Sequence, residues 1–243
     1  MWKRMILWLF AALALSTCGS KEKIYRIGID TSWYPLQLDR KGPYIQAFME
    51  DLLLAIAHEE GRCFEKIRVS QENLLFGLKE RHYDGILTSF TPRAHTNDVY
   101  DFSELFLHTG PVLILLDDNG ENLTNKMEGK RVAVTSLQDE TLLLALYPKA
   151  ISCYYNSISE SLEALALNTI DAIIIDYFLA LHYVQDLYHN RTKIVSLHLQ
   201  NSGLRLLTLH GENKEFIKII NQGLKKTHDN GVYDRLLKKW RLQ

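Results

Sequence analysis

The stretch that most constrains the fold runs from Tyr83 to Phe102 and reads YDGILTSFTPRAHTNDVYDF. Its apolar start, Gly85-Ile86-Leu87, is typical of an interior strand in a sheet that is covered on both faces. The strand then gives way to hydroxyl residues. Because Pro92 follows Thr91, the pattern predicts a helix with Thr91 as its N-cap and Pro92 at its first position. The stretch is therefore predicted to join a buried strand to a helix.

The same junction predicts an anion site. It offers free backbone N–H groups, the hydroxyls of Ser89 and Thr91, and the positive end of a helix dipole. Arg93 adds a planar guanidinium that can hold a carboxylate through two hydrogen bonds. The alternative is a plain strand-to-helix connection in which the hydroxyls only cap the helix and Arg93 is solvated. These residues alone leave both interpretations open.

The first 17 residues predict a signal peptide, because the basic pair Lys3-Arg4 precedes an apolar run from Met5 to Leu15. This run is too short to span a membrane in the mature protein. The sequence Leu15-Ser16-Thr17-Cys18 that follows resembles a bacterial lipobox, which implies that Cys18 becomes the lipidated N-terminus. The alternative is ordinary cleavage near this point, with Cys18 removed or left free.

Charge and cysteine content narrow the function classes. Loss of residues 1–17 removes Lys3 and Arg4 from the 28 basic residues and none of the 29 acidic ones, which leaves a net charge of −3 and no sign of a nucleic-acid partner. Cys63 and Cys153 fit no metal-ligand spacing, so both are predicted to be small buried hydrophobes. The sequence contains no glycine-rich phosphate loop, and we expect neither a cofactor nor a metal.

Short apolar segments alternate with amphipathic ones along the chain, which predicts α/β lobes with largely parallel sheets. Ser157 and Glu160 have the spacing of a capping box at a helix start, and a further helix is predicted from about Tyr177 to Tyr188. Gly110-Pro111 opens an apolar run that is predicted to cross into a second lobe, and the segment from Gly203 to Thr208 is predicted to return. The expected fold is α/β, with two Rossmann-like lobes joined by two hinge strands. The predicted ranges are 1–17 for the signal peptide, 18–23 for a lipidated tether, 24–110 and 203–243 for the first lobe, and 111–202 for the second lobe.

Other predicted strands also end in polar or aromatic residues. The strand at residues 24–29 leads to Asp30 and Trp33, and the buried run Ala172 to Ile175 ends at Asp176, whose carboxylate suits one cationic nitrogen. Ligands of such folds bind at the carboxyl ends of strands that face a cleft. Asp176 has the alternative role of helix N-cap, and Trp33 has the alternative role of packing within the core.

In order along the chain, these motifs resemble the bacterial extracellular solute-binding proteins of family 3, the periplasmic or lipid-anchored receptors of polar amino-acid ABC importers. The resemblance covers residues 24–243 and rests on YRIGIDTSWYPL, F-x-x-D-L, YDGILTS…TPR…DFSE, GKRVAV, DAIIID and NKEFIKIINQGLKKTHDNGVYDRLLKKW. It implies a periplasmic binding protein-like fold of type II, in which hinge closure clamps a ligand between the lobes.

The resemblance also implies roles for single residues. Asp30 and Trp33 would face the ligand side chain. Ser89 and Thr91 would contact the ligand through backbone and hydroxyl groups. Asp176 would pair with the α-ammonium group of the ligand.

Two departures from the family pattern bear on the ligand. Thr96 stands where the family has its arginine, and Arg93 lies three residues earlier. We favour an Arg93 that still reaches the ligand carboxylate, because an uncompensated anion in a closed cleft is costly; loss of this clamp is the alternative. The segment from Thr135 to Glu140 replaces a Gly-Thr-rich turn, so the ligand need not be a simple free amino acid. Thr96, Thr135 and Gln138 are further candidates for ligand contact.

We therefore expect a substrate-binding lipoprotein outside the inner membrane, which delivers a polar amino acid or similar zwitterion to an ABC permease. One alternative is an enzyme of the same fold, an amino-acid-related dehydratase or lyase. The histidines are scattered, and His95 near the predicted site is more simply a solvated helix residue than a base. The other alternative is a ligand-sensing or interaction module that has lost the amino-acid clamp.

Overall fold

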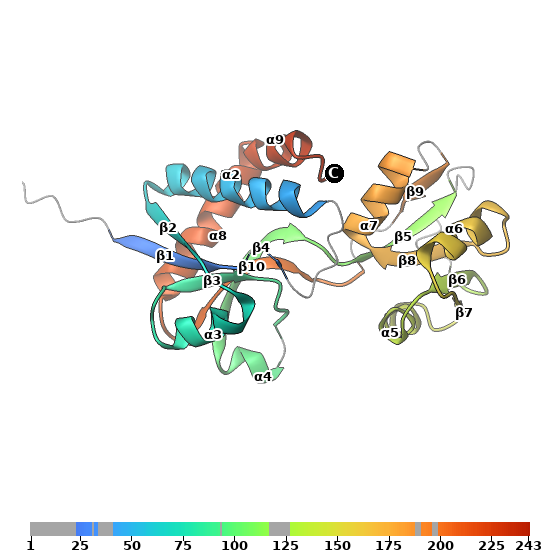
Figure 1. Cartoon of the computed structure of the whole chain (residues 1–243), viewed down its shortest axis with the longest axis horizontal. Coiled ribbons are helices and arrows are strands. Elements are labelled where there is room, and N and C mark those ends of the chain that lie inside the picture. Colours follow the sequence, from blue (N-terminus) through green and yellow to red (C-terminus); the bar gives the residue numbers. More distant parts are fainter. Residues whose placement is uncertain are drawn as a thin grey trace, which may run out of the picture.

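The computed structural model describes residues 23–30, 32–33, 41–92, 94–116, 127–187, 191–195 and 199–243. These residues form two α/β lobes, each built around one five-stranded sheet (Figure 1). The predicted signal peptide, Cys18 and Arg93 lie outside the described residues. Within the described residues, no helix is long and apolar enough to cross a membrane.

The first sheet has the strand order β2-β1-β3-β10-β4. Its parallel strands are β1 (Ile24–Ile29), β2 (Cys63–Arg68) and β3 (Gly85–Thr88). Strand β10 (Gly203–Leu209) runs antiparallel to β3 and to β4 (Tyr100–His108). One face packs against α2 (Gly42–Glu60) and α8 (Lys214–Asp229), with α9 (Val232–Lys239) beside them, and the other face packs against α3 (Gln71–Lys79).

The second sheet has the strand order β7-β6-β8-β5-β9. Its parallel strands are β6 (Arg131–Val134), β7 (Ile151–Tyr154) and β8 (Ala172–Asp176). Strand β5 (Pro111–Leu116) is antiparallel to β8 and to β9 (Thr192–Ile194). Helices α6 (Ile158–Ala166) and α7 (Tyr177–Leu181) cover one face, and α5 (Leu137–Leu146) covers the other.

The buried strands explain why both faces of each sheet are covered. In β8, Ile173 and Ile175 pack under α6, whereas Ala172 and Ile174 pack under α5. Successive side chains of a strand point to opposite faces, so a continuous apolar run requires a helix on each side. The predicted capping box of α6 is also confirmed, because the Ser157 hydroxyl accepts a hydrogen bond from the Glu160 N–H at 3.2 Å.

Several local predictions are wrong. The helix expected to start at Pro92 starts later, as the single turn α4 (Ala94–Asn97), because the strand end is already turned by Thr88, whose Oγ1 accepts from the Phe90 N–H at 3.2 Å. The helix expected over 177–188 is α-helical only to Leu181 and continues as a π-helix over His182–Leu187. Strands β4 and β7 were not predicted.

The predicted burial of the two cysteines is also wrong. Cys63 is exposed and Cys153 is half-buried, and both are free. Each lies on a strand at the edge of its sheet, β2 for Cys63 and β7 for Cys153. An edge strand is flanked by a neighbour on one side only, so its side chains are covered less completely than those of central strands.

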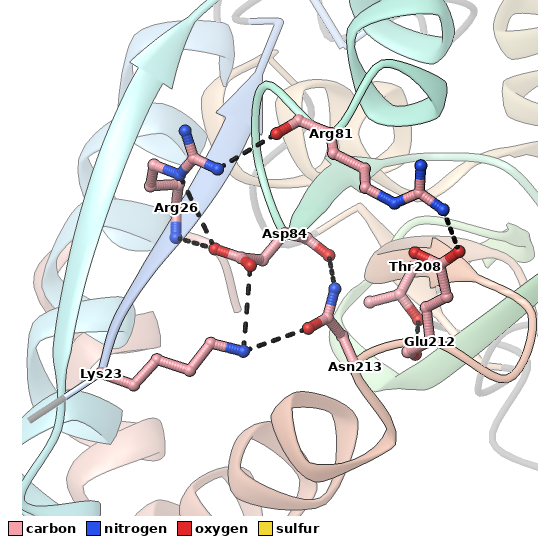
Figure 2. Close-up of polar contacts among 7 residues, drawn as sticks. All are labelled: Lys23, Arg26, Arg81, Asp84, Thr208, Glu212 and Asn213. Carbon is pink, nitrogen blue, oxygen red and sulfur yellow. Dashed lines mark hydrogen bonds and ion pairs between the residues drawn. The ribbon is translucent and has the colours of Figure 1, made fainter.

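A polar cluster holds the start of the first sheet together, and Figure 2 shows it around Asp84. The Asp84 carboxylate accepts from the Arg26 backbone N–H at 2.8 Å, and the Asp84 N–H donates to the Arg26 carbonyl at 2.8 Å. Lys23 Nζ lies 3.9 Å from the same carboxylate, and Asn213 donates to the Asp84 carbonyl at 3.0 Å. The Arg26 guanidinium donates to the carbonyl of Arg81 at 3.1 Å. We call this pairing of Asp84 with Arg26 an aspartate clasp.

The second lobe repeats the clasp with different residues. The Asp171 carboxylate accepts from the Arg131 N–H at 2.8 Å, and the Asp171 N–H donates to the Arg131 carbonyl at 2.8 Å. The Arg131 guanidinium donates to the carbonyl of Asn168 at 3.0 Å. Asn168 and its counterpart Arg81 both have a φ of +56°, in the left-handed region. Both sheets therefore begin with the same local geometry.

We expect Asp84→Ala to lower the free energy of unfolding by about 1–3 kcal/mol, because it leaves the Arg26 N–H without its acceptor. Asp171→Ala is expected to cause a similar loss through the Arg131 N–H. Urea denaturation followed by circular dichroism measures both changes.

Glu212→Gln is the matched control. It removes the ion pair with Arg81, which spans 2.8 Å but leaves the Arg81 side chain 71% exposed. We expect a change below about 1 kcal/mol, since exposed pairs are screened by solvent. If Glu212→Gln lowered the free energy of unfolding as much as Asp84→Ala, the larger contribution assigned to the aspartate clasp would be contradicted.

Candidate ligand-binding site

The two lobes are joined where the chain crosses between β4 and β5 and returns before β10. The Thr109 N–H donates to the Ser202 carbonyl at 3.0 Å, so the two crossing segments lie side by side. A Cβ on Gly110 would lie 2.4 Å from the Gln200 carbonyl oxygen, and one on Gly203 would lie 2.1 Å from the Leu107 carbonyl oxygen. The close approach of the two backbones therefore requires glycine at both positions.

A polar cleft of about 440 Å³ lies between the lobes at this crossing. The first lobe contributes the turn after β3. The second lobe contributes the residues after β6 and the end of β8. The cleft residues that carry polar side chains are Ser89, Thr91, Thr109, Thr135, Ser136, Gln138, Asp139, Asp176, Gln200 and Ser202. Strand carboxyl ends of both sheets therefore converge on one site, as expected for open α/β sheets.

The structure brings together five of the predicted site residues in this cleft: Ser89, Thr91, Thr135, Gln138 and Asp176. They come from both lobes, and Ser89 and Asp176 are 87 positions apart in the chain. Thr96 lies in α4 and is not among the residues that line the cleft. The contact of the five residues with a ligand stays a prediction.

Asp176 is the most unusual group in the cleft. It ends β8, and its side chain makes no capping hydrogen bond to α7, so the N-cap role is not adopted here. Burial, and to a smaller extent the negative charge of Asp139, together raise the pKa of the Asp176 carboxyl to about 6. A half-buried carboxylate without a described hydrogen-bond donor is a site that attracts a cation.

Asp139, Ser136 and Thr109 line the same cleft, although the sequence did not single them out. Ser136 caps α5, because its Oγ accepts from the Asp139 N–H at 3.1 Å. The spacing of Ser136 and Asp139 could have predicted the start of α5 from the sequence. Thr109 is only 4% exposed, and its hydroxyl has no described hydrogen-bond partner.

Asp30 and Trp33 lie elsewhere in this structure. The Asp30 carboxylate accepts from the Ser32 N–H at 3.1 Å in a local turn. Trp33 is 3% exposed and belongs to the core of the first lobe with Met49 and Leu53. Its placement matches the packing alternative, and its role toward a ligand stays a prediction, as does that of Asp30.

A second interlobe cavity, of about 520 Å³, is larger but mostly apolar. Its lining includes Leu107, Tyr177, Tyr233 and Leu242, and the Tyr177 hydroxyl donates to the Leu242 carbonyl at 3.2 Å. Figure 1 shows the same arrangement, with the C-terminus close to α7. Convergent polar groups and the perturbed Asp176 are found in the other cleft, which is therefore the candidate binding site.

In the described part of the chain, no group of three His, Cys, Asp or Glu side chains is placed to hold a metal ion. What the cleft does offer is hydroxyls, amides and carboxylates around a polar space. This composition suits the hydrogen bonding of a small charged molecule.

Two α/β lobes with a polar cleft at their crossing strands define a two-lobed ligand-binding protein. The family of bacterial extracellular solute-binding proteins, family 3, matches the chain over residues 25–243. The chain belongs to this family.

Individual relatives and solved structures are also similar to this chain. The chain is 25% identical over 259 residues to the arginine-binding extracellular protein ArtP of Bacillus subtilis, with 98% of each chain covered. The solved L-cystine solute receptor of Neisseria gonorrhoeae, in an unliganded open conformation, has a TM-score of 0.68 and 18% identity over 89% of this chain and 92% of its own. An ancestral cyclohexadienyl dehydratase has a TM-score of 0.66 and 19% identity over 89% and 92%. The structural likenesses confirm the predicted fold class.

We expect Asp176→Asn to stabilise the ligand-free protein. The folded-state pKa of about 6 lies above the ordinary value of 3.8, so wild-type stability falls as the pH rises through this interval. At pH 7.5 the variant should be more stable by about 1–2 kcal/mol, after allowance for the solvent that still reaches the carboxylate. Thermal unfolding between pH 3.5 and about 7.5 measures the difference, which should vanish at the acid end.

The exposed Asp98 provides the control, since Asp98→Asn should change stability by less than about 0.5 kcal/mol at any pH in this range. A less stable Asp176→Asn variant at pH 7.5 would show that the carboxylate is satisfied by its surroundings.

Proposed function

We propose that this protein captures a polar amino acid or a similar small zwitterion in the interlobe cleft and delivers it to an ABC permease. The observation that carries the proposal is the half-buried Asp176 carboxylate, which has no described donor and a raised pKa. The α-ammonium of an amino acid would supply the missing charge and hydrogen bonds, and would offset the desolvation of the carboxylate. The relative ArtP, an arginine-binding protein, supports the amino-acid class.

The opposite wall of the cleft is proposed to hold the ligand carboxylate. Ser89 and Thr91 line it and supply hydroxyl and backbone donors. Arg93 follows two residues later and is the proposed cationic partner, in line with the family resemblance. For Asp30 and Trp33 the role of contacting the ligand side chain rests on the family resemblance alone, since neither lines the cleft.

Lobe closure is the proposed binding step. The chain passes between the two lobes at residues 109–110 and returns before β10, so a change of backbone angles at the crossings would move one lobe as a unit against the other. A zwitterion that contacts Asp176 on one lobe and Ser89 on the other binds the closed form more tightly than the open one. This difference in affinity is what shifts the population toward closure.

We also propose that the protein is exported and anchored through Cys18. The support is the lipobox-like sequence before Cys18 and the extracellular character of the family. Cys18→Ala is expected to abolish incorporation of a labelled fatty acid in cells, whereas Cys63→Ala should leave it unchanged. Undiminished labelling of the Cys18→Ala protein would contradict the anchor.

We propose binding rather than catalysis. The described titratable groups in the cleft are Asp139 and Asp176, both on the second lobe. An elimination needs a base within reach of the proton that is removed and an acid within reach of the leaving group, whereas the proposed role of Asp176 is to pair with the ligand ammonium. Mass spectrometry of each bound amino acid before and after incubation is the test, and any conversion would favour the dehydratase or lyase alternative.

Ligand binding is predicted to depend on pH. A cationic ligand prefers the ionised form of Asp176, so binding must release a proton when the pH is below about 6. Affinity should therefore be constant above about pH 7 and fall by up to about tenfold for each pH unit below 6. Isothermal titration calorimetry with the best ligand from a screen of the standard amino acids measures this profile.

Asp176→Asn should weaken binding of the same ligand by at least about 100-fold, because the variant cannot compensate the ammonium charge. The pH dependence should disappear together with the carboxylate. Wild-type affinity in this variant would rule out the proposed role of Asp176, and Asp98→Asn serves as the unchanged control.

A further inference from the structure

The described charges in the cleft all have one sign. Among the lining residues that the structure describes, the ionisable ones are Asp139 and Asp176. Asp176 ends β8, and Asp139 lies in the first turn of α5, which follows β6. Strands β6 and β8 are parallel neighbours, with Ala133 paired to Ile173, and neighbouring strands lie about 4.8 Å apart. The two carboxylates therefore belong to adjacent strand ends on the same wall.

The Asp139 carboxylate is held in place by its own turn. Its Oδ2 accepts from the Ser136 hydroxyl at 2.7 Å and from the Thr135 hydroxyl at 3.4 Å. Both bonds go to the same oxygen, and Oδ1 has no described partner. The side chain is thus an oriented acceptor with one oxygen left for a ligand.

The cleft contains a further group that is ready for a ligand. The Thr109 hydroxyl is buried, with the residue 4% exposed, and it has no described hydrogen-bond partner. Thr109 and both carboxylates line the same polar space. A buried hydroxyl without a partner is unfavourable, and a hydrogen bond from a ligand N–H group would offset this cost.

The two carboxylates repel each other when both are ionised, so the ionised pair is unfavourable unless a cation lies nearby. The charge of Asp139 adds to the burial that raises the pKa of Asp176. A zwitterion with one ammonium group compensates Asp176 and leaves Asp139 uncompensated. The alternative for Asp139 is a purely structural role, in which its charge favours the positive N-terminal end of α5.

We propose that the ligand presents two cationic nitrogens to the second lobe, one to Asp176 and one to Asp139. The substrate class is then dibasic: two ammonium or guanidinium groups joined by an alkyl chain, as in a basic amino acid or in a diamine that lacks the carboxylate. The inference rests on the proposed function of the cleft and specifies what the cleft accepts.

Calorimetry of the purified full chain at pH 7.5 tests this with matched ligand pairs. L-lysine is compared with L-norleucine, and L-arginine with L-citrulline, since each pair differs in one cationic group. We expect the charged member of at least one pair to bind 10-fold or more tightly than its neutral partner. In Asp139→Asn this ratio should fall below about 3, because only the second cation loses its partner.

The matched control is Glu140→Gln, one residue away in the same helix turn. The Glu140 carboxylate accepts from Ser152 at 2.6 Å and from the Tyr154 hydroxyl, and it is not among the cleft residues. This variant makes the same change in net charge and should keep the wild-type ratio. If Asp139→Asn does not fold by circular dichroism, Asp139→Thr provides the same loss of charge with a hydroxyl at the start of α5.

The outcomes distinguish a failure of the dibasic inference from a failure of the proposed function. Equal binding of both members in both pairs, or an undiminished ratio in Asp139→Asn, overturns the dibasic inference and leaves amino-acid binding intact. Failure of every standard amino acid and every amine to bind overturns the proposed function and the inference with it. Once L-lysine has bound 10-fold or more tightly than L-norleucine, cadaverine distinguishes the two sources: affinity equal to that of L-lysine identifies a diamine ligand, and weaker affinity identifies a basic amino acid.

Discussion

Each sheet is held at its start by a carboxylate that binds a backbone amide of the neighbouring strand. In the first lobe Asp84 binds the Arg26 N–H, and in the second lobe Asp171 binds the Arg131 N–H, each at 2.8 Å. These bonds fix the register of the central parallel pairs, β1 with β3 and β6 with β8. A slip of one residue would turn every side chain of a strand to the opposite face, and it would also move the strand end. The position of Asp176 at the far end of β8 therefore depends on a contact at the near end.

The aspartates at the starts of the strands differ from Asp176 at a strand end in whether the protein supplies them with hydrogen-bond donors and cations. Asp84 and Asp171 accept backbone hydrogen bonds and lie near Lys or Arg side chains. Asp176 has neither a described donor nor a described cation, and burial raises its pKa. A carboxylate satisfied within the protein stabilises the fold, whereas an unsatisfied one in a cleft is available to a partner. This contrast distinguishes the two structural carboxylates from the carboxylate that is proposed to bind the ligand, without reference to any relative.

The structural features that could be predicted from the sequence are those that depend on a local pattern of residues. The apolar runs of β3 and β8, the two lobes and the capping box at Ser157 all follow from burial periodicity or cap spacing. Strand β4 was missed because its polar positions, such as Glu104, read as a loop; its partner β10 lies about a hundred residues later. The position of Asp139 in the cleft was missed for a similar reason, since it arises from the adjacency of β6 and β8. Trp33 is buried by α2 residues that no local pattern connects to it.

The edge positions of the described cysteines have a practical consequence. Cys63 lies on the outer strand of the first sheet and Cys153 on the outer strand of the second, and neither is bonded to another sulfur. Each lobe thus carries one native thiol, away from the cleft residues. A donor and an acceptor dye attached to this pair would report the distance between the lobes in single molecules. The proposed lobe closure can then be followed in this protein without adding a residue to it.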